Sequence, residues 1–274
     1  MTDFLGYQDR DSVIHRLNAT SKLLVFLLLT VAGILSFDIR FLLLLTVFAG
    51  FVLYLSKISW RSIRILVYLT VVFALLNLVL IYVFAPQYGV ELYHDKTILL
   101  GSGYYALTSQ QLFYELLVLL KYCFSVPLSL AFLLTTQPSQ LAAGLNRVGI
   151  SYKIAYAFSL TLRYLPTIQN EFQTTKKVQE ARGFALGKKA SLGKKMMAST
   201  RLLLSLAFST LEKVETISEA MALRRFGKKR KRTWYYSQKW RLPDWLALTM
   251  GILLLLLAVW LVSIDGGRFW NPFR

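Results

Sequence analysis

The chain has 274 residues, 55% of them hydrophobic, and it carries a formal net charge of +18. A water-soluble core of this size does not normally bury so much apolar material, so the composition indicates a protein that folds in a bilayer. The single cysteine, Cys123, excludes a disulfide framework and a cysteine-based metal site.

Apolar segments predict five membrane spans, because about 20 apolar residues are needed to cross about 30 Å of hydrocarbon. Four spans are expected at about 20–37, 40–56, 65–85 and 112–134, and the fifth begins near residue 243. The first two segments are short and nearly contiguous. We interpret them as a tight hairpin of two spans, with one long broken or re-entrant element as the alternative.

Two charged residues interrupt the predicted fourth span. Glu115 lies close to its outer end and is expected to reach water. Lys121 lies deeper, where a charge is a candidate for function by default. Snorkelling, or a hydrogen bond to a neighbouring helix, would instead give Lys121 a structural role, and both interpretations remain open.

The positions of lysine and arginine predict the orientation, because cytoplasmic loops retain positive charge. The link between the second and third spans carries Lys57, Arg61 and Arg64, whereas the loop at 86–111 carries one lysine and two acidic residues. The N-terminus is therefore expected in the cytoplasm and the loop outside.

Most of the positive charge lies in the segment between the fourth and fifth spans. Thr135 to Arg241 holds 21 Lys or Arg against five Glu, a net charge of +16, so this segment is expected in the cytoplasm. The predicted organisation is a transmembrane region at 1–134, a cytoplasmic or interfacial region at 135–242, and a last span with a short outside tail at 243–274.

The basic segment shows the signals of several helices. A short helix is expected to end at Gly149, and a second, apolar one begins at Ser151 and either lies in the membrane interface or re-enters the membrane. Pro166 suits the first turn of a third helix. The fourth, about 196–223, is amphipathic. Its apolar stripe predicts a partner surface or internal packing, and consists of Leu204, Ala207, Leu211, Val214, Ser218 and Met221.

Two short motifs in this segment resemble each other. "ARGFALGKK" at 181–189 is echoed by "LRRFGKK" at 223–229, with Arg182 and Arg224 separated by 42 residues. Each motif closes a predicted helix, so each Arg can extend its planar guanidinium towards a partner. Two such helix ends, each a tip that carries an arginine, would fit two similar acceptor grooves. The neighbouring lysines suit anionic lipid headgroups.

The chain lacks the usual signs of catalysis. There is no P-loop of the form G-x-x-x-x-G-K-[ST], and "GSGYY" at 101–105 lacks the lysine. The two histidines, His15 and His94, fall on opposite sides of the membrane in the predicted topology, so they are not expected to share a metal or act as an acid–base pair. We predict that the chain is not an enzyme.

Several blocks together resemble the T component, the transmembrane coupling subunit, of energy-coupling factor transporters. They are "DSVIHRLNATSKLL" before the first span, "TTQPSQLAAGLNRVGISYKIAYAFSLTLRYLPTIQNEF" after the fourth, and the paired arginine motifs. The resemblance implies a bacterial or archaeal cytoplasmic membrane protein with amphipathic coupling helices between the fourth and fifth spans.

The resemblance also implies partners. In that family, two coupling helices end in Ala-Arg-Gly-like motifs that dock on a pair of ATP-binding cassette ATPases, which bind the ATP and Mg²⁺. A separate small membrane subunit binds a vitamin, a related micronutrient or a metal ion. The motif residues here are Ala181, Arg182, Gly183, Leu223, Arg224 and Arg225. The second motif replaces the small flanking residues with large ones, which puts the tightness of its contact in doubt.

The resemblance implies no cofactor in this chain itself, and no nucleic acid is expected as a partner. The main alternative is a membrane-anchored polybasic module that binds anionic lipid or nucleic acid, with an affinity set by total charge. A membrane enzyme is a weaker alternative, because the spans contain no catalytic constellation. The apolar stripe of the fourth cytoplasmic helix is expected to form part of the surface for the substrate-binding subunit.

Overall fold

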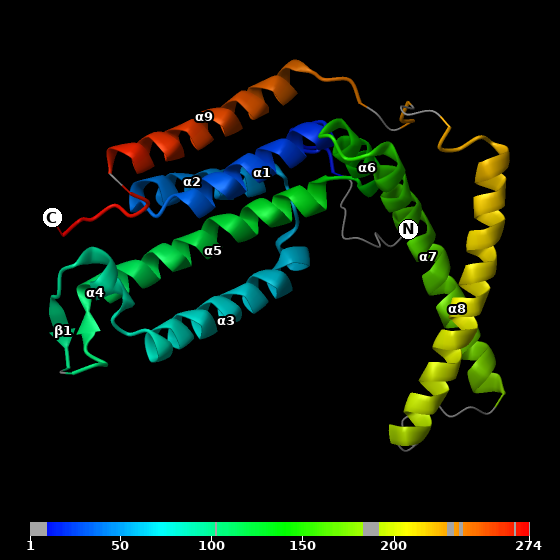
Figure 1. The fold of residues 1–274 in the computed structure, drawn as a ribbon, viewed down its shortest axis with the longest axis horizontal. Helices are drawn as coiled ribbons and strands as arrows, with labels where there is room; N and C mark the ends of the chain where they lie inside the picture. The colour runs from blue at the N-terminus through cyan, green and yellow to red at the C-terminus, as the bar shows by residue number, and fades with distance from the viewer. Residues whose placement is uncertain are drawn as a thin grey trace. The chain divides into compact units, whose positions relative to one another are not determined.

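The computed structural model describes residues 10–101, 103–182, 192–228, 233–235, 238–265 and 267–273 (Figure 1). The chain divides into two compact units. The first consists of Met1–Gly144 and Gln238–Arg274, and the second of Leu145–Ser237. The described residues are mainly helical, which confirms the predicted fold class.

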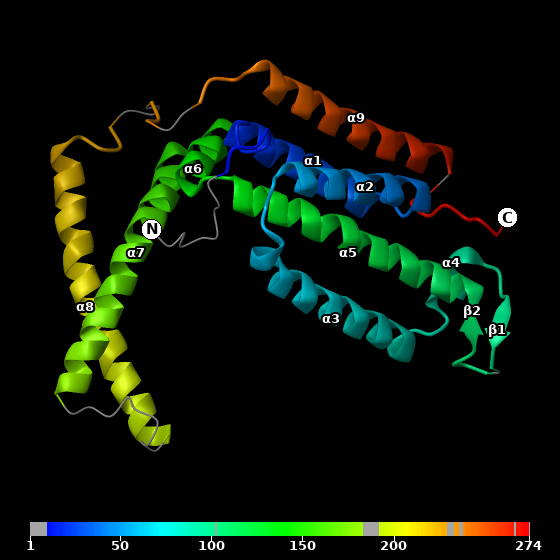
Figure 2. The same ribbon diagram turned by 180° about the vertical axis from the view of Figure 1, so that it is seen from behind.

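The first unit contains the apolar helices and a small antiparallel hairpin. The helices are α1 (Ala19–Leu35), α2 (Ile39–Leu55), α3 (Trp60–Phe84), α4 (Tyr88–Tyr93), α5 (Ser109–Thr135) and α9 (Leu242–Ile264), and the strands are β1 (Ile98–Leu100) and β2 (Leu107–Thr108). Helix α6 (Pro138–Arg147) crosses the boundary between the units. Figure 2 shows α1, α2, α5 and α9 running side by side.

Three of these helices are long and apolar enough to cross a membrane. They are α3 from Ile63, α5 and α9, with 22, 27 and 23 residues in the apolar stretch. Helices α1 and α2 have 17 residues each, which is the lower limit for a span, and they are joined by only three residues. The predicted number of five spans remains a prediction.

The core of the first unit is made by α1, α2 and α5. Leu29, Phe41, Leu45, Leu117 and Phe124 are all at least 96% buried in one cluster. Aspartate or asparagine side chains begin the first two helices: Asn18 accepts from Thr20 N and Asp38 accepts from Arg40 N. Helix α3 packs mainly on α5 and exposes most of its apolar surface.

A buried polar cluster joins α1, α5 and α9 at one end. Asp244, 1% exposed, accepts hydrogen bonds from Asn18 N at 2.7 Å, Ser21 Oγ at 2.8 Å and Arg241 N at 2.8 Å. Lys22 Nζ donates to the carbonyl of Thr135 at 2.7 Å. These bonds satisfy polar groups that would otherwise be costly at the ends of apolar helices.

An aromatic cluster closes the opposite ends of the same helices. Phe37 N donates to the carbonyl of Arg268 at 2.8 Å, and the rings of Phe37 and Phe269 lie 4.4 Å apart. Lys121 Nζ lies 3.1 Å from the centroid of the Phe37 ring and 3.5 Å from the carbonyl oxygen of Ile34. Of the two interpretations of Lys121, these contacts favour the structural one, in which it meets a neighbouring helix.

The second unit is built on two long helices, α7 (Tyr152–Ala181) and α8 (Leu192–Leu223). Ser151 begins α7 as predicted, since its side chain accepts from Ile154 N. Pro166 does not begin a new helix: it lies inside α7. The prediction of separate second and third helices was therefore wrong. A proline removes one backbone hydrogen bond without necessarily ending a helix that is otherwise continuous.

Candidate docking site on the crossed helices

The first predicted tip is the C-terminal end of α7. Ala181 is the last helical residue, and Arg182 N donates to the carbonyl of Val178 at 3.1 Å to close the final turn. Both residues are exposed. Gly183 lies outside the described residues, as do Lys188 and Lys189. The described part of this motif therefore presents an exposed arginine at a helix end.

The second predicted tip is the C-terminal end of α8. Phe226 N donates to the carbonyl of Met221 at 2.9 Å, and Arg225 N donates to the carbonyl of Ala222 at 2.8 Å. This pair of bonds is a Schellman motif, in which the residue after the cap adopts a left-handed conformation. That residue is Arg225, with φ at 54°.

The Schellman motif falls where the second sequence motif departs from Ala-Arg-Gly. Arg225 occupies the position that Gly183 holds in the first motif, and glycine is the residue best suited to a positive φ. The second tip therefore adopts a glycine-like backbone without a glycine. Arg224 is the cap residue of this motif, and its neighbour Leu223 is 86% exposed.

An aromatic cluster holds the second tip against the beginning of α7. The ring of Phe226 lies 4.5 Å from that of Tyr156 and 5.8 Å from that of Tyr152, and Trp234 lies 5.4 Å from Tyr152. Trp234 Nε1 also donates to Asn146 Oδ1 at 3.0 Å. The sequence analysis missed this cluster, although the repeated phenylalanine after each arginine was a signal of it.

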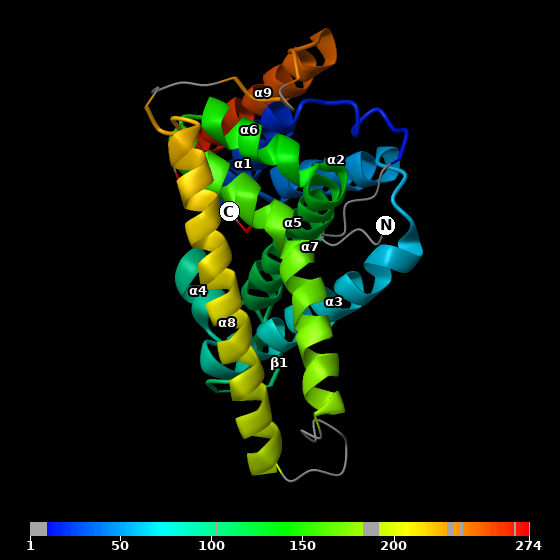
Figure 3. The same ribbon diagram turned by 90° about the vertical axis from the view of Figure 1, so that its right-hand side faces the viewer.

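Helices α7 and α8 run antiparallel beside each other (Figure 3), and their crossing is seen in Figure 1. At the crossing, Lys213 Nζ forms an ion pair with Glu171, whose Oε1 also accepts from Ser209 Oγ at 3.2 Å. These hydrogen bonds, chiefly the one from Lys213, hold the pKa of the Glu171 carboxyl below its usual value of 4.5.

The crossing lies at equivalent positions of the internal repeat. Glu171 and Lys213 are 42 residues apart, as are Arg182 and Arg224. Each arginine therefore follows its own crossing residue by eleven positions, a helical distance of about 16 Å. Because the helices run antiparallel, the two arginines lie on opposite sides of the crossing at matched distances.

The predicted apolar stripe is exposed along most of α8. Leu204, Leu211 and Val214 are 53%, 62% and 51% exposed, Ala207 is also exposed, and Met221 is partly buried. Leu202, in contrast, is 2% exposed. Exposed apolar surface of this kind is typical of contacts with another protein or with a membrane, and the stripe remains a predicted partner surface.

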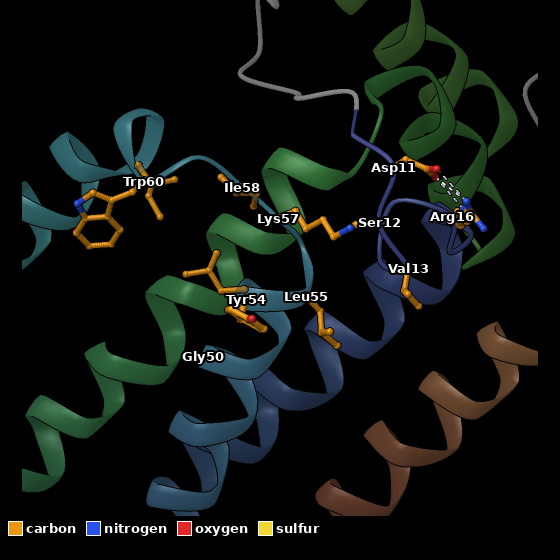
Figure 4. A pocket seen from close by; sticks show the side chains of 12 residues that line it. Asp11, Ser12, Val13, Arg16, Gly50, Tyr54, Leu55, Lys57, Ile58 and Trp60 are labelled. Atoms are coloured by element: carbon orange, nitrogen blue, oxygen red, sulfur yellow. Dashed lines mark hydrogen bonds and ion pairs between the residues drawn. The ribbon is translucent and has the colours of Figure 1, made fainter.

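A groove of about 810 Å³ lies in the first unit, between the N-terminal segment and the link from α2 to α3. Figure 4 shows Lys57 extending towards Ser12 and the ion pair between Asp11 and Arg16 at its rim. Arg10 Nη1 donates to the carbonyl of Lys57 at 2.9 Å and ties the two segments together. In the part of the chain that the structure describes, no three His, Cys, Asp or Glu side chains gather as a metal site.

Comparison with known proteins gives a consistent result. The family model described as CbiQ, cobalt transport protein, matches residues 10–235. Two similar proteins are named energy-coupling factor transporter transmembrane protein EcfT. The one from Streptococcus equi subsp. equi is 27% identical over 256 residues, covering 90% of this chain and 92% of its own. The one from Lactococcus lactis subsp. cremoris is 25% identical over 264 residues, covering 93% and 96%.

The match includes the first four apolar segments and both crossed helices, so it covers the elements that carry the arginine tips. The relatives are matched over nearly their whole length. The chain therefore belongs to the CbiQ family, the family of the transmembrane T components of energy-coupling factor transporters.

Proposed function

We propose that this chain couples two cytoplasmic ATP-binding cassette ATPases to a separate substrate-binding membrane subunit. The observation that carries the proposal is the matched placing of Arg182 and Arg224, each about 16 Å from one crossing point on antiparallel helices. Two tips so related present the same kind of side chain in opposite directions. They suit two similar acceptors that are themselves related by an approximate twofold axis.

In this proposal, the crossed helices transmit movement from the ATPases. ATP binding and hydrolysis move the two ATPases together and apart, and each arginine transmits the movement through charge-assisted hydrogen bonds to its acceptor groove. The ion pair of Glu171 with Lys213 and the aromatic cluster around Phe226 keep the pair together, so movement of one tip turns both helices.

The exposed stripe of α8 is the proposed contact for the substrate-binding subunit. Its members Leu204, Ala207, Leu211, Val214 and Met221 form one face of a helix whose end moves with an ATPase. The transported substrate is a vitamin, a related micronutrient or a metal ion, and ATP and Mg²⁺ are bound by the partner ATPases. The N-terminus lies in the cytoplasm of a bacterium or archaeon, because Lys57, Arg61 and Arg64 share the cytoplasmic side with the crossed helices.

Replacement of the tip arginines tests the proposal. Arg182→Ala and Arg224→Ala are expected to lower ATPase affinity at least tenfold each, since each loses charge-assisted hydrogen bonds. The matched control is Arg163→Ala, which removes the same charge from an exposed position inside α7. Co-purification of the ATPases and uptake by cells are measured for all variants, and circular dichroism checks that the helices remain folded.

The same variants separate the proposal from the polybasic alternative. Under that alternative, Arg163→Ala weakens binding to anionic lipid or nucleic acid as much as the tip variants do, because only total charge matters. Arg182→Lys keeps the charge but loses the planar guanidinium, so it is expected to be defective in ATPase docking. Normal ATPase co-purification and uptake in the double tip variant would refute the coupling role.

A further inference from the structure

A basic pocket lies at the beginning of α9, in the first unit. Its volume is about 580 Å³, and its lining consists of Arg16, Gln238, Lys239, Arg241 and Asp244. The oxygens of Asp244 already accept from Asn18 N, Ser21 Oγ and Arg241 N, so its charge is engaged within the protein. The side chains of Lys239 and Arg241 are not used by the coupling mechanism.

An apolar groove of about 530 Å³ also reaches the beginning of α9, where Pro243 lines it. Neighbouring residues of the chain line the two: Arg16 and Arg241 line the pocket, whereas Leu17 and Pro243 line the groove. From there the groove runs along α9 past Ala247 and towards Leu253, and its other walls come from α1, α2 and α5. The charged pocket and the long apolar groove together are the candidate space.

The charges around this space favour an anionic occupant. Four cations border it, since Lys22 lines the groove and Arg16, Lys239 and Arg241 line the pocket. Against them stand two carboxylates, Asp244 and the Asp11 that pairs with Arg16, which leaves a net charge of +2. Lys22 is 8% exposed, and its ammonium donates to the carbonyls of Thr135 and His15.

Two tryptophans indicate the level of the pocket in the membrane. The rings of Trp240 and Trp245 lie 4.9 Å apart on either side of the first residues of α9. Tryptophan is enriched at the level of lipid headgroups, where its ring meets both apolar chains and water. The tryptophans therefore place the basic pocket at headgroup level, and the groove runs along helices apolar enough to face acyl chains.

We propose that this space binds an anionic phospholipid, with its phosphate in the basic pocket and an acyl chain in the groove. Lys239 and Arg241 supply the charge that selects the headgroup, and Arg16 lies beside them. The lipid joins the N-terminal segment, α1 and α9, the elements that the Asp244 cluster also joins. This binding site does not depend on the arginine tips or on the ATPases.

Native mass spectrometry of the full chain in detergent tests the site. The probes are dioleoyl phosphatidylglycerol and dioleoyl phosphatidylcholine, which have the same acyl chains but different charge, and soluble glycerol 3-phosphate. We expect phosphatidylglycerol to bind at least tenfold more tightly than phosphatidylcholine. In the double variant Lys239→Gln/Arg241→Gln the affinity for phosphatidylglycerol is expected to fall about thirtyfold.

Two further variants make the test specific. Arg61→Gln/Arg64→Gln removes the same charge from exposed positions of α3 that line neither cavity, and it is expected to leave binding unchanged. Ala247→Phe fills the groove without altering charge, and it is expected to lower the affinity for both phospholipids.

Four results would each overturn the proposal. An equal loss in Arg61→Gln/Arg64→Gln would show non-specific attraction to basic surface. Equal affinity for the two phospholipids would show that the pocket does not select a headgroup. Binding of glycerol 3-phosphate as tight as that of phosphatidylglycerol, or full binding by Ala247→Phe, would show that the groove holds no acyl chain.

Discussion

Replacement of Gly33 by alanine tests the packing of α1 on α5. A Cβ at Gly33 would lie 2.1 Å from Cζ of Phe124 and 2.8 Å from Cε1 and Cε2. Carbon atoms in contact are normally separated by about 3.5–4.0 Å, so the overlap exceeds about 1 Å. Phe124 is 4% exposed and belongs to the main core cluster, so its ring has little room to move.

Overpacking of this kind costs about 1–3 kcal/mol, and we expect Gly33→Ala to lower the free energy of unfolding by that amount. Gly50→Ala is the matched control, because it adds the same methyl group inside α2 where no atom lies within 4 Å. Alanine is the better helix former by about 0.5–1 kcal/mol, so the control is expected to be neutral or slightly stabilising.

The assay is reversible unfolding of the full chain in detergent, followed by circular dichroism. The double variant Gly33→Ala/Phe124→Leu provides a second measurement, because the smaller side chain makes room for the new methyl group. Its loss of stability should be less than the sum of the two single losses. If Gly33→Ala were as stable as Gly50→Ala, the close packing of α1 against the Phe124 ring would be refuted.

Three other predictions concern the polar cluster and the crossed helices. Asp244→Ala leaves the backbone N–H groups of Asn18 and Arg241 without their acceptor, while Ser21 Oγ keeps the carbonyl of Asn18. The variant is expected to cost about 3 kcal/mol, measured by the same unfolding assay. Glu171→Gln loses the ion pair with Lys213 and less than about 1 kcal/mol at neutral pH. Because the pKa of Glu171 is lowered on folding, its contribution to the free energy of unfolding is present above pH 4.5 and disappears as the pH falls through the lowered pKa. The stabilities of the variant and the wild type should therefore converge in acid. A difference that stays constant with pH would contradict this. Phe226→Ala removes the aromatic contact at the second tip, and faster hydrogen exchange of amides near the end of α8 is expected, with unchanged exchange arguing against the anchor.

Much of the helical structure could be predicted from the sequence, because its signals are local. Ser151 caps α7 through its own side chain, and the apolar runs of α3, α5 and α9 have the length that a bilayer requires. The predicted end of α8 at Leu223 agrees with the structure. The repeated arginine motifs could likewise be found by comparing the chain with itself.

Other features depend on contacts between distant residues. The rule that proline begins a helix failed at Pro166, because the rest of α7 continues the helix on both sides of it. The left-handed conformation of Arg225 was hidden, since glycine is the residue that normally signals a positive φ. The hydrogen bonds from Asn18 and Ser21 to Asp244 join residues more than 200 positions apart, and no local pattern encodes them.

The sequence by itself determined that this is a helical membrane protein with a basic segment and two related arginine motifs, because hydropathy, charge and repetition are properties of short stretches. Only the tertiary structure decided that Glu171 meets Lys213 at equivalent positions of the repeat and so places the two arginines on opposite sides of one crossing. It also decided that Lys239 and Arg241 line one pocket together with Arg16. The physical reason is that pairing and cavities arise from which helix faces pack together, and many alternative packings share the same local patterns.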